Sequence, residues 1–130
     1  MDNKYYASVP DKATYTSFME TCQQVADMDV YKLHQAEQSY GDSWKKRGGI
    51  GAFMMLARKW DRLEKQVAEH NYDVFVAAIK DNRPEGIIDD IRDLRRYLML
   101  VEAELQRQGE INDDGQHELF LEDRCEWKTG

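Results

Sequence analysis

Two pairs of acidic residues, each set three positions apart beside an apolar helical pattern, are the groups best suited to do chemistry in this sequence. They are Asp61 with Glu64 and Asp90 with Asp93. Residues at i and i+3 share a helix face, so each pair presents two carboxylates in one direction. Mg²⁺ is commonly held by a few carboxylates together with substrate phosphates, and a further carboxylate can activate a water. We therefore expect Mg²⁺ as the cofactor, with these four residues as metal ligands and catalytic groups.

A basic, glycine-containing segment at 40–49 precedes the helical pattern of the first acidic pair. Between Trp44 and Lys65 there are seven basic and two acidic residues, a local charge of +5. Glycines let backbone amides approach an anion, and a helix N-terminus supplies unpaired N–H groups. We expect the substrate-binding residues to be phosphate-holding cations and stacking aromatics: Lys45, Arg47 and Arg58 for the former, Trp44 and Tyr97 for the latter. An ordinary solvated loop is the competing interpretation.

The competing interpretation of the acids is equally simple. Acids at this spacing occur in most charged helices, where they form surface ion pairs of little energetic value. Asp61 with Lys65 and Asp93 with Arg96 are pairs of this kind. The joint pattern favours a site, because both acidic pairs touch apolar faces and a basic loop leads into the first helix.

Helical periodicity predicts the elements that position these residues. We expect helices from Thr14 or Thr16 to about Ala26, from a cap at Asp27 or Asp29 to Tyr40, from about Ile50 to Glu69, from about Tyr72 to Ile79, and from Glu85 or Ile87 to about Gln106. Gly41 is expected to end the second, and 81–86 to form a turn. With no strand pattern of any length, the fold class is all-α, an antiparallel bundle of four or five helices.

The apolar faces predict how the two acid-bearing helices pack. At about 100° per residue, Asp61 and Glu64 fall inside one stripe of the third helix, and Asp90, Asp93 and Tyr97 flank the apolar stripe of the fifth. The two stripes consist of Ile50, Phe53, Met54, Ala57 and Trp60, and of Ile87, Ile91, Leu94, Leu98, Val101 and Leu105. If these stripes pack together, four carboxylates converge at the edge of a core. That arrangement is costly unless something positive lies among them.

Composition limits the class of protein. The chain has 130 residues and a formal net charge of −7, which argues against general duplex binding because such affinity comes mainly from neutralising phosphates. We expect an N-terminal arm at 1–12, a helical domain at 13–106 that contains the site residues, and an acidic tail at 107–130. No targeting or membrane-spanning pattern is present, so we expect a cytoplasmic protein that does not bind membranes. Cys22 and Cys125 are expected to be free thiols.

Several short motifs resemble the phage and bacterial family called the nucleotide modification associated domain, first class. They are Tyr40-Gly41-Asp42-Ser43-Trp44, Arg58-Lys59-Trp60-Asp61-Arg62-Leu63-Glu64, and Asp90-Ile91-Arg92-Asp93-Leu94 with Tyr97. The resemblance spans about Leu33 to Leu105. More distantly, the acid spacing resembles the MazG and dimeric dUTPase type of all-α nucleoside triphosphate pyrophosphohydrolase. In those enzymes the acids bind Mg²⁺ and the bond between the α and β phosphates is cut.

The resemblance implies a MazG-like fold, Mg²⁺ bound by the four acids, a nucleotide as ligand, and a homo-oligomer, either a dimer or a tetramer. Asp61 and Asp90 stand where that superfamily usually has Glu, one methylene longer, so nucleotide handling is implied more securely than hydrolysis. Our first hypothesis is a phage-type, Mg²⁺-dependent nucleotide-binding protein that acts as a pyrophosphohydrolase on a canonical or modified nucleoside triphosphate. The alternatives are a non-catalytic protein that sequesters a nucleotide against host defence, and an acidic protein whose tail engages a host partner.

Overall fold

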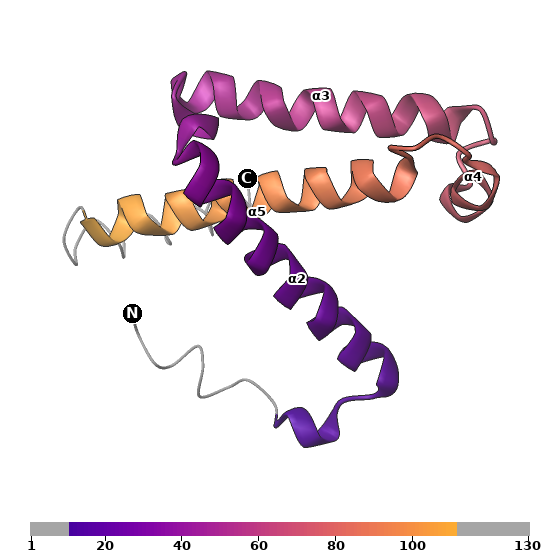
Figure 1. The fold of residues 1–130 in the computed structure, drawn as a ribbon, viewed down its shortest axis with the longest axis horizontal. Coiled ribbons are helices and arrows are strands. Elements are labelled where there is room, and N and C mark those ends of the chain that lie inside the picture. The colour runs from indigo at the N-terminus through magenta and orange to yellow at the C-terminus, as the bar shows by residue number, and fades with distance from the viewer. Residues whose placement is uncertain (1–10, 112–130) are drawn as a thin grey trace, which may run out of the picture. The chain divides into compact units, whose positions relative to one another are not determined.

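The computed structural model describes residues 11–111, and this part of the chain is all-α, as the sequence predicted. Its elements are η1 (Lys12–Thr14), α2 (Ser17–Tyr40), η2 (Ser43–Lys45), α3 (Gly48–Ala68), α4 (Val74–Lys80) and α5 (Ile87–Ile111) (Figure 1). None of the described helices is long and apolar enough to cross a membrane. Most of the predicted N-terminal arm, most of the acidic tail, and Cys125 lie outside the described residues.

Backbone contacts divide the chain into two compact units, one of residues 27–101 and one of residues 1–26 with 102–130. The 27–101 unit holds the second part of α2, then η2, α3, α4 and the first part of α5. It contains every site residue predicted from the sequence. Of the other unit the structure describes η1, the start of α2 and the end of α5, which runs beyond the predicted end at Gln106. The predicted domain boundaries remain predictions.

The segment 17–40 forms one helix, α2, where two had been predicted. The Thr16 hydroxyl accepts the backbone N–H three residues later, at 3.2 Å, and so caps its start as predicted. Gly41 ends it, with a φ of 61° and an N–H that donates to the Glu37 carbonyl at 2.8 Å. The predicted break at Asp27 or Asp29 is wrong. Asp29 lies in mid-helix with 0% exposure, where ion pairs to α5 use its carboxylate.

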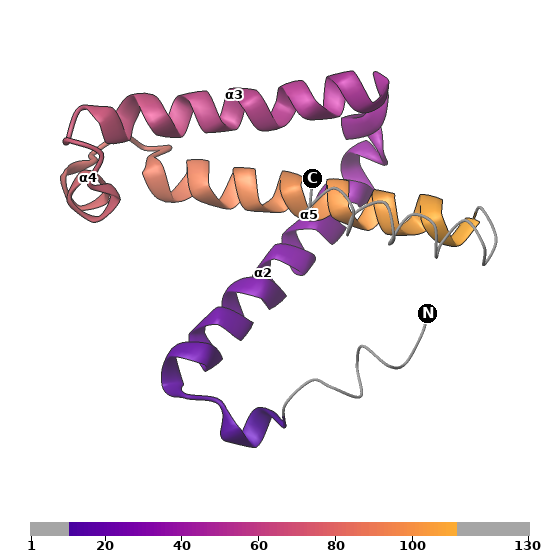
Figure 2. The same cartoon turned by 180° about the vertical axis from the view of Figure 1, so that it is seen from behind.

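Helices α3 and α5 run side by side in opposite directions, as Figures 1 and 2 show. Lys59 Nζ lies 3.0 Å from an Asp93 oxygen, and Arg62 Nε lies 3.0 Å from an Asp90 oxygen. Moving three residues forward along α3 therefore moves the contact three residues back along α5. This register confirms antiparallel packing for the pair.

The face that α3 turns toward α5 differs from the predicted one. Ile50, Phe53 and Trp60 of the predicted stripe are 83%, 65% and 52% exposed, whereas Ala52 is buried. Residues 50–57 are all apolar or glycine, so the N-terminal half of α3 is apolar nearly all round and its own pattern does not select a face. The prediction that the Ile50 to Trp60 stripe packs against α5 is wrong, and Lys59 and Arg62 point to α5 instead.

A sharp reversal and a side-chain cap set the start of α4. Asn71 and Tyr72 have left-handed φ values of 56° and 62°, so the chain turns where the helix had been predicted to begin. Asp73 then caps α4, because its Oδ1 accepts the N–H groups of Phe75 and Val76, both at 3.1 Å.

The predicted turn at 81–86 is present and is held by one carboxylate. Asp81 accepts from Arg83 Nε at 2.9 Å and from the Ile87 N–H at 2.5 Å. The bond from the Arg83 guanidinium holds the Asp81 pKa far below its usual value. The turn therefore fixes where α5 begins. Arg83 Nη2 donates to Asp81 at 3.0 Å and also reaches Asp90, in the first turn of that helix, at 3.4 Å.

Candidate functional site

A cavity of about 390 Å³ opens in the 27–101 unit, lined by one face each of α2 and α5, by the segment around η2, and by the start of α3. This volume lies in the range typical of small-molecule sites. The lining residues that matter for ligand chemistry are the aromatics Tyr40, Trp44 and Tyr97, the cations Lys32, Arg47 and Arg96, and one acid, Asp93.

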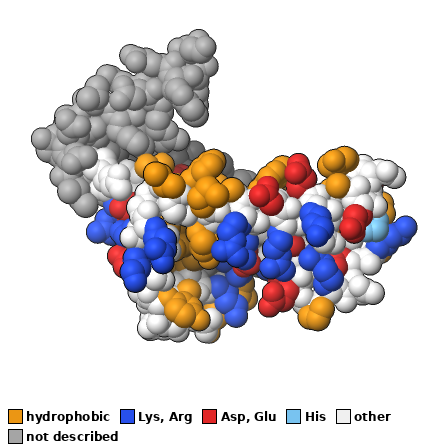
Figure 3. Space-filling model, turned by 90° about the horizontal axis from the view of Figure 1, so that it is seen from above, with side chains coloured by type: hydrophobic (Ala, Val, Ile, Leu, Met, Phe, Trp, Pro, Cys, Tyr) orange, Lys and Arg blue, Asp and Glu red, His pale blue; other side chains and the backbone are white. Residues whose placement is uncertain are grey.

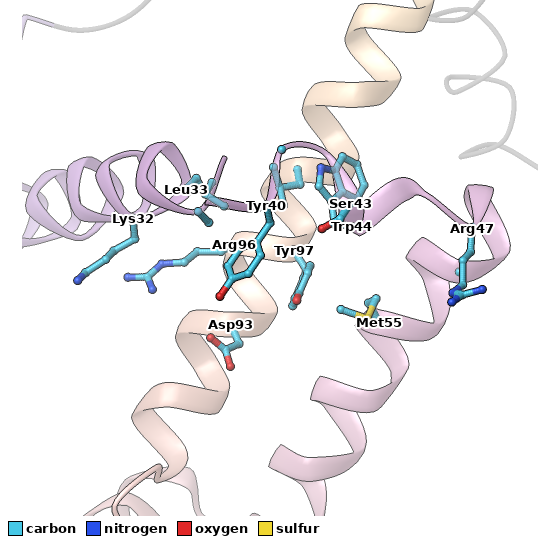
Figure 4. A pocket seen from close by; sticks show the side chains of 14 residues that line it. Lys32, Leu33, Tyr40, Ser43, Trp44, Arg47, Met55, Asp93, Arg96 and Tyr97 are labelled. Atoms are coloured by element: carbon cyan, nitrogen blue, oxygen red, sulfur yellow. The ribbon is translucent and has the colours of Figure 1, made fainter. Parts of the chain in front are cut away.

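The lining cations lie at two ends of the cavity, with aromatic rings between them (Figure 4). Lys32 and Arg96 form one end, Arg47 stands at the other, and Trp44 and Tyr97 lie between. Flat rings offer stacking surfaces, while guanidinium and ammonium groups bind phosphate oxygens. The cavity therefore suits a small, anionic ligand with an aromatic part.

Behind one of these cations lies the most buried acid of the unit. The Asp29 carboxylate, 0% exposed, accepts from Arg95 Nε at 2.5 Å, from Arg95 Nη2 at 2.8 Å and from Arg96 Nε at 2.8 Å. Hydrogen bonds from Arg95, and then from Arg96, lower the Asp29 pKa against the opposing effect of burial. The bonds between Arg95 and Asp29 also raise the pKa of Arg95. One carboxylate between two guanidinium groups leaves one net positive charge beside the cavity.

Asp90 is neutralised by two arginines. It is 1% exposed, with Arg62 Nε 3.0 Å from one oxygen and Arg83 Nη2 3.4 Å from the other. A buried carboxylate is stable only when it is paired in this way. The sequence predicted that positive charge must lie near these acids. Around Asp90, the side chains of Arg62 and Arg83 supply it.

The other three acids of the predicted metal site have different surroundings from Asp90. Asp93 lines the cavity and pairs with Lys59 at 3.0 Å. Asp61 and Glu64 are exposed on α3, since they belong to the stripe that faces away from α5. Among the side chains that the structure describes, no group of three or more His, Cys, Asp or Glu is arranged to hold a metal ion. The donor set in this structure thus does not fit the Mg²⁺ site that the resemblance implies, and the site remains a prediction.

Three of the five predicted substrate-binding residues line the cavity: Trp44, Arg47 and Tyr97. The other two lie outside its lining. Lys45 pairs with Asp42 at 3.8 Å, and Arg58 is exposed on α3. Figure 3 looks onto the α3 side of the unit, where Lys and Arg side chains form a row between apolar and acidic ones. The basic charge read from the sequence is therefore divided between the cavity and this outer surface.

Sequence reasoning missed Lys32, Tyr40, Arg96 and the buried Asp29 as parts of the site. A signal was present on both helices. Lys32, Ala36 and Tyr40 follow one another at i, i+4 and i+8 on α2, and Asp93, Arg96 and Tyr97 follow at i, i+3 and i+4 on α5. What the sequence lacked was the pairing of these two faces with each other.

No protein-family model, curated protein or solved structure matches this chain. The resemblance to the nucleotide modification associated domain and to MazG-like enzymes therefore remains a prediction. The functional argument depends on the cavity and its side chains.

Proposed function

We propose that this protein binds a nucleotide in the cavity between α2, η2, α3 and α5. The observation that carries the proposal is that aromatic and cationic side chains line one cavity of nucleotide size. Trp44, Tyr40 or Tyr97 would pack against the base or sugar, and Lys32, Arg47 and Arg96 would hold phosphate oxygens. This assignment agrees with the nucleotide handling implied by the resemblance.

Charge supports a small ligand over a long polyanion. The whole chain carries a formal charge of −7, while the cavity lining holds three cations and one acid. A duplex would meet the overall negative charge, whereas a single nucleotide would meet mainly the local positive one.

Binding without turnover is the form of this function that the geometry supports best. Asp90 is paired with two arginines and Asp93 with Lys59, so neither carboxylate is free to take a metal without breaking an ion pair. A protein of this kind would sequester its nucleotide, as in the anti-defence hypothesis. Pyrophosphohydrolysis is the second candidate, and the observation in its favour is that Asp93 lines the cavity.

A thermal-shift screen against ribo- and deoxynucleoside triphosphates, with Mg²⁺ and with EDTA, tests this proposal, because a ligand that binds only the folded state raises its apparent stability. We expect at least one nucleotide to raise Tm equally in both conditions. A shift that requires Mg²⁺, with pyrophosphate release that Asp61→Asn abolishes, would instead establish the hydrolase. If no nucleotide changes Tm, nucleotide binding is wrong.

Two tryptophans provide a matched pair for locating the site. Trp44 lines the cavity, whereas Trp60 is 52% exposed on α3 and lies outside the lining. Trp44→Ala is expected to remove the nucleotide-induced shift and Trp60→Ala to retain it. The reverse result would move the site to the outer surface of α3.

Exposed apolar surface supports a homo-oligomer, which we propose together with a cytoplasmic location. Ile50, Phe53 and Trp60 of α3 and Phe75 and Ile79 of α4 are all more than half exposed. Large apolar side chains exposed in this number favour a protein interface. The host-partner hypothesis concerns the acidic tail, and deleting 109–130 tests it: a biological effect that survives the deletion excludes the tail as its cause.

A further inference from the structure

The Asp29 cluster joins a fully buried carboxylate to a cation of the candidate site. Asp29 is 0% exposed and lies on α2, three residues before Lys32, which lines the same end of the cavity as Arg96. Arg95 and Arg96 are neighbours on α5, and both donate to this one carboxylate. Only Arg96 of the two lines the cavity.

We propose that Asp29 is a positioning residue that holds the Arg96 guanidinium in place to receive the phosphate groups of the ligand, at the Lys32 end of the cavity. The inference rests on the proposed nucleotide binding and deepens it by assigning the phosphate end of the site. It predicts a ligand whose phosphates lie between Lys32 and Arg96, with its base directed toward Trp44.

The hydrogen-bond geometry carries the assignment. Arg96 uses its Nε for Asp29, and among the described residues no acceptor bonds to its two Nη groups. Arg95 binds the same carboxylate through Nε and Nη2. Arg95 thus compensates the Asp29 charge with a two-point contact, while Arg96 is held at one point. Its remaining nitrogens then form the planar fork that suits a phosphate.

Pre-orientation would improve binding, because an arginine side chain otherwise loses rotamer freedom when it binds a ligand. Arg96 is only 18% exposed in its side chain, so its position is already restricted in the free protein. The carboxylate lowers the local positive charge, but Arg95 offsets that loss. The net effect is an ordered phosphate-binding group with its charge retained.

The test separates orientation from folding by comparing ligands with and without phosphate. Isothermal titration would measure ATP, inorganic tripolyphosphate and adenosine binding to the full-length chain and to Asp29→Asn. We expect the variant to bind ATP and tripolyphosphate about tenfold more weakly, and adenosine within about twofold of the unsubstituted protein. A purely structural role would weaken all ligands together or none.

Arg95→Lys is the matched control. It retains the positive charge and removes the two-point contact with Asp29, so it should lower Tm while keeping the ATP-to-adenosine affinity ratio. Arg96→Lys retains charge but lacks the Nε that bonds to Asp29, and it should lower that ratio as Asp29→Asn does. Asp29→Asn and Arg96→Lys both break the contact between these two residues. The double variant should therefore have an ATP-to-adenosine affinity ratio little lower than that of either single variant.

Two results would overturn the inference. If Asp29→Asn folds and keeps the ATP-to-adenosine ratio, or if Arg95→Lys changes the ratio as strongly as Arg96→Lys, Asp29 does not position Arg96. Should Asp29→Asn fail to fold, Asp29→Glu takes its place, because it keeps the charge and moves the acceptor by one methylene; an unchanged ATP-to-adenosine ratio in that variant would overturn the inference. Absence of ATP and tripolyphosphate binding to the unsubstituted protein, with other nucleotides equally inactive, would instead reject nucleotide binding altogether.

Discussion

Asp90 fits the predicted metal-binding motif, but in the structure it is a buried carboxylate paired with arginines. Its spacing from Asp93 predicted a metal ligand, but its carboxylate is 1% exposed and contacts Arg62 and Arg83. Those contacts join α5 to α3 and to the turn before α5. We therefore expect the main effect of removing this side chain to be on folding stability.

Asp90→Ala is predicted to lower the free energy of unfolding by about 1–3 kcal/mol, because it leaves two arginines without their shared acceptor. Urea unfolding followed by circular dichroism measures the change. Glu85→Gln is the control, since Glu85 also approaches Arg62, at 3.8 Å, but is 80% exposed and should contribute under about 0.5 kcal/mol. Equal losses for the two variants would contradict a structural role for Asp90.

At the level of elements, rules based on neighbouring residues predicted the helix ends better than they predicted the contacts of residues inside the helices. Thr16 and Gly41 act as the sequence predicted, because a hydroxyl cap and a left-handed glycine involve only nearby backbone groups. Asp29 was predicted as a cap and is not one, since arginines 66 and 67 residues away use its carboxylate. Capping rules that consider only nearby residues fail where a distant arginine binds the same carboxylate.

The short helix α4 should depend strongly on its cap. Asp73 satisfies two N–H groups that otherwise lack partners at the start of a seven-residue helix. Asp73→Ala is predicted to lower the free energy of unfolding by about 1 kcal/mol, measured by denaturant titration, with Asp73→Ser recovering most of the loss. A loss of equal size in the Ser variant would show that something other than the cap is responsible.

Over the whole molecule, the described residues bury little apolar surface for a chain of this length. Among the described side chains the buried apolar ones are Ala52, Ala77 and Ile87, while many larger ones are exposed. The homo-oligomer that we propose would cover part of this exposed surface, and the outward stripe of α3 is the part that we expect it to use.

Phe53→Glu tests that expectation, because a charge at the centre of an apolar interface is desolvated without a partner. We predict that it raises the dissociation constant of the oligomer at least about tenfold, measured by analytical ultracentrifugation over a concentration series. Gln38→Glu adds a charge at an exposed position of α2 and should leave association unchanged. A monomeric unsubstituted protein at all concentrations would refute the homo-oligomer.

The sequence by itself determined the helical class, the end of α2 at Gly41 and the turn at 81–86, and it offered Thr16 as one of two caps for the start of α2. It also singled out Trp44, Arg47 and Tyr97, which line one cavity. These features follow from periodicity, turn chemistry and the gathering of aromatic and basic residues in short segments. Only the tertiary structure decided which face of α3 meets α5, because residues 50–57 are apolar nearly all round. That rotation places Lys59 and Arg62, rather than Asp61 and Glu64, opposite Asp93 and Asp90. It separates the predicted carboxylate cage and leaves the cavity bordered by arginines.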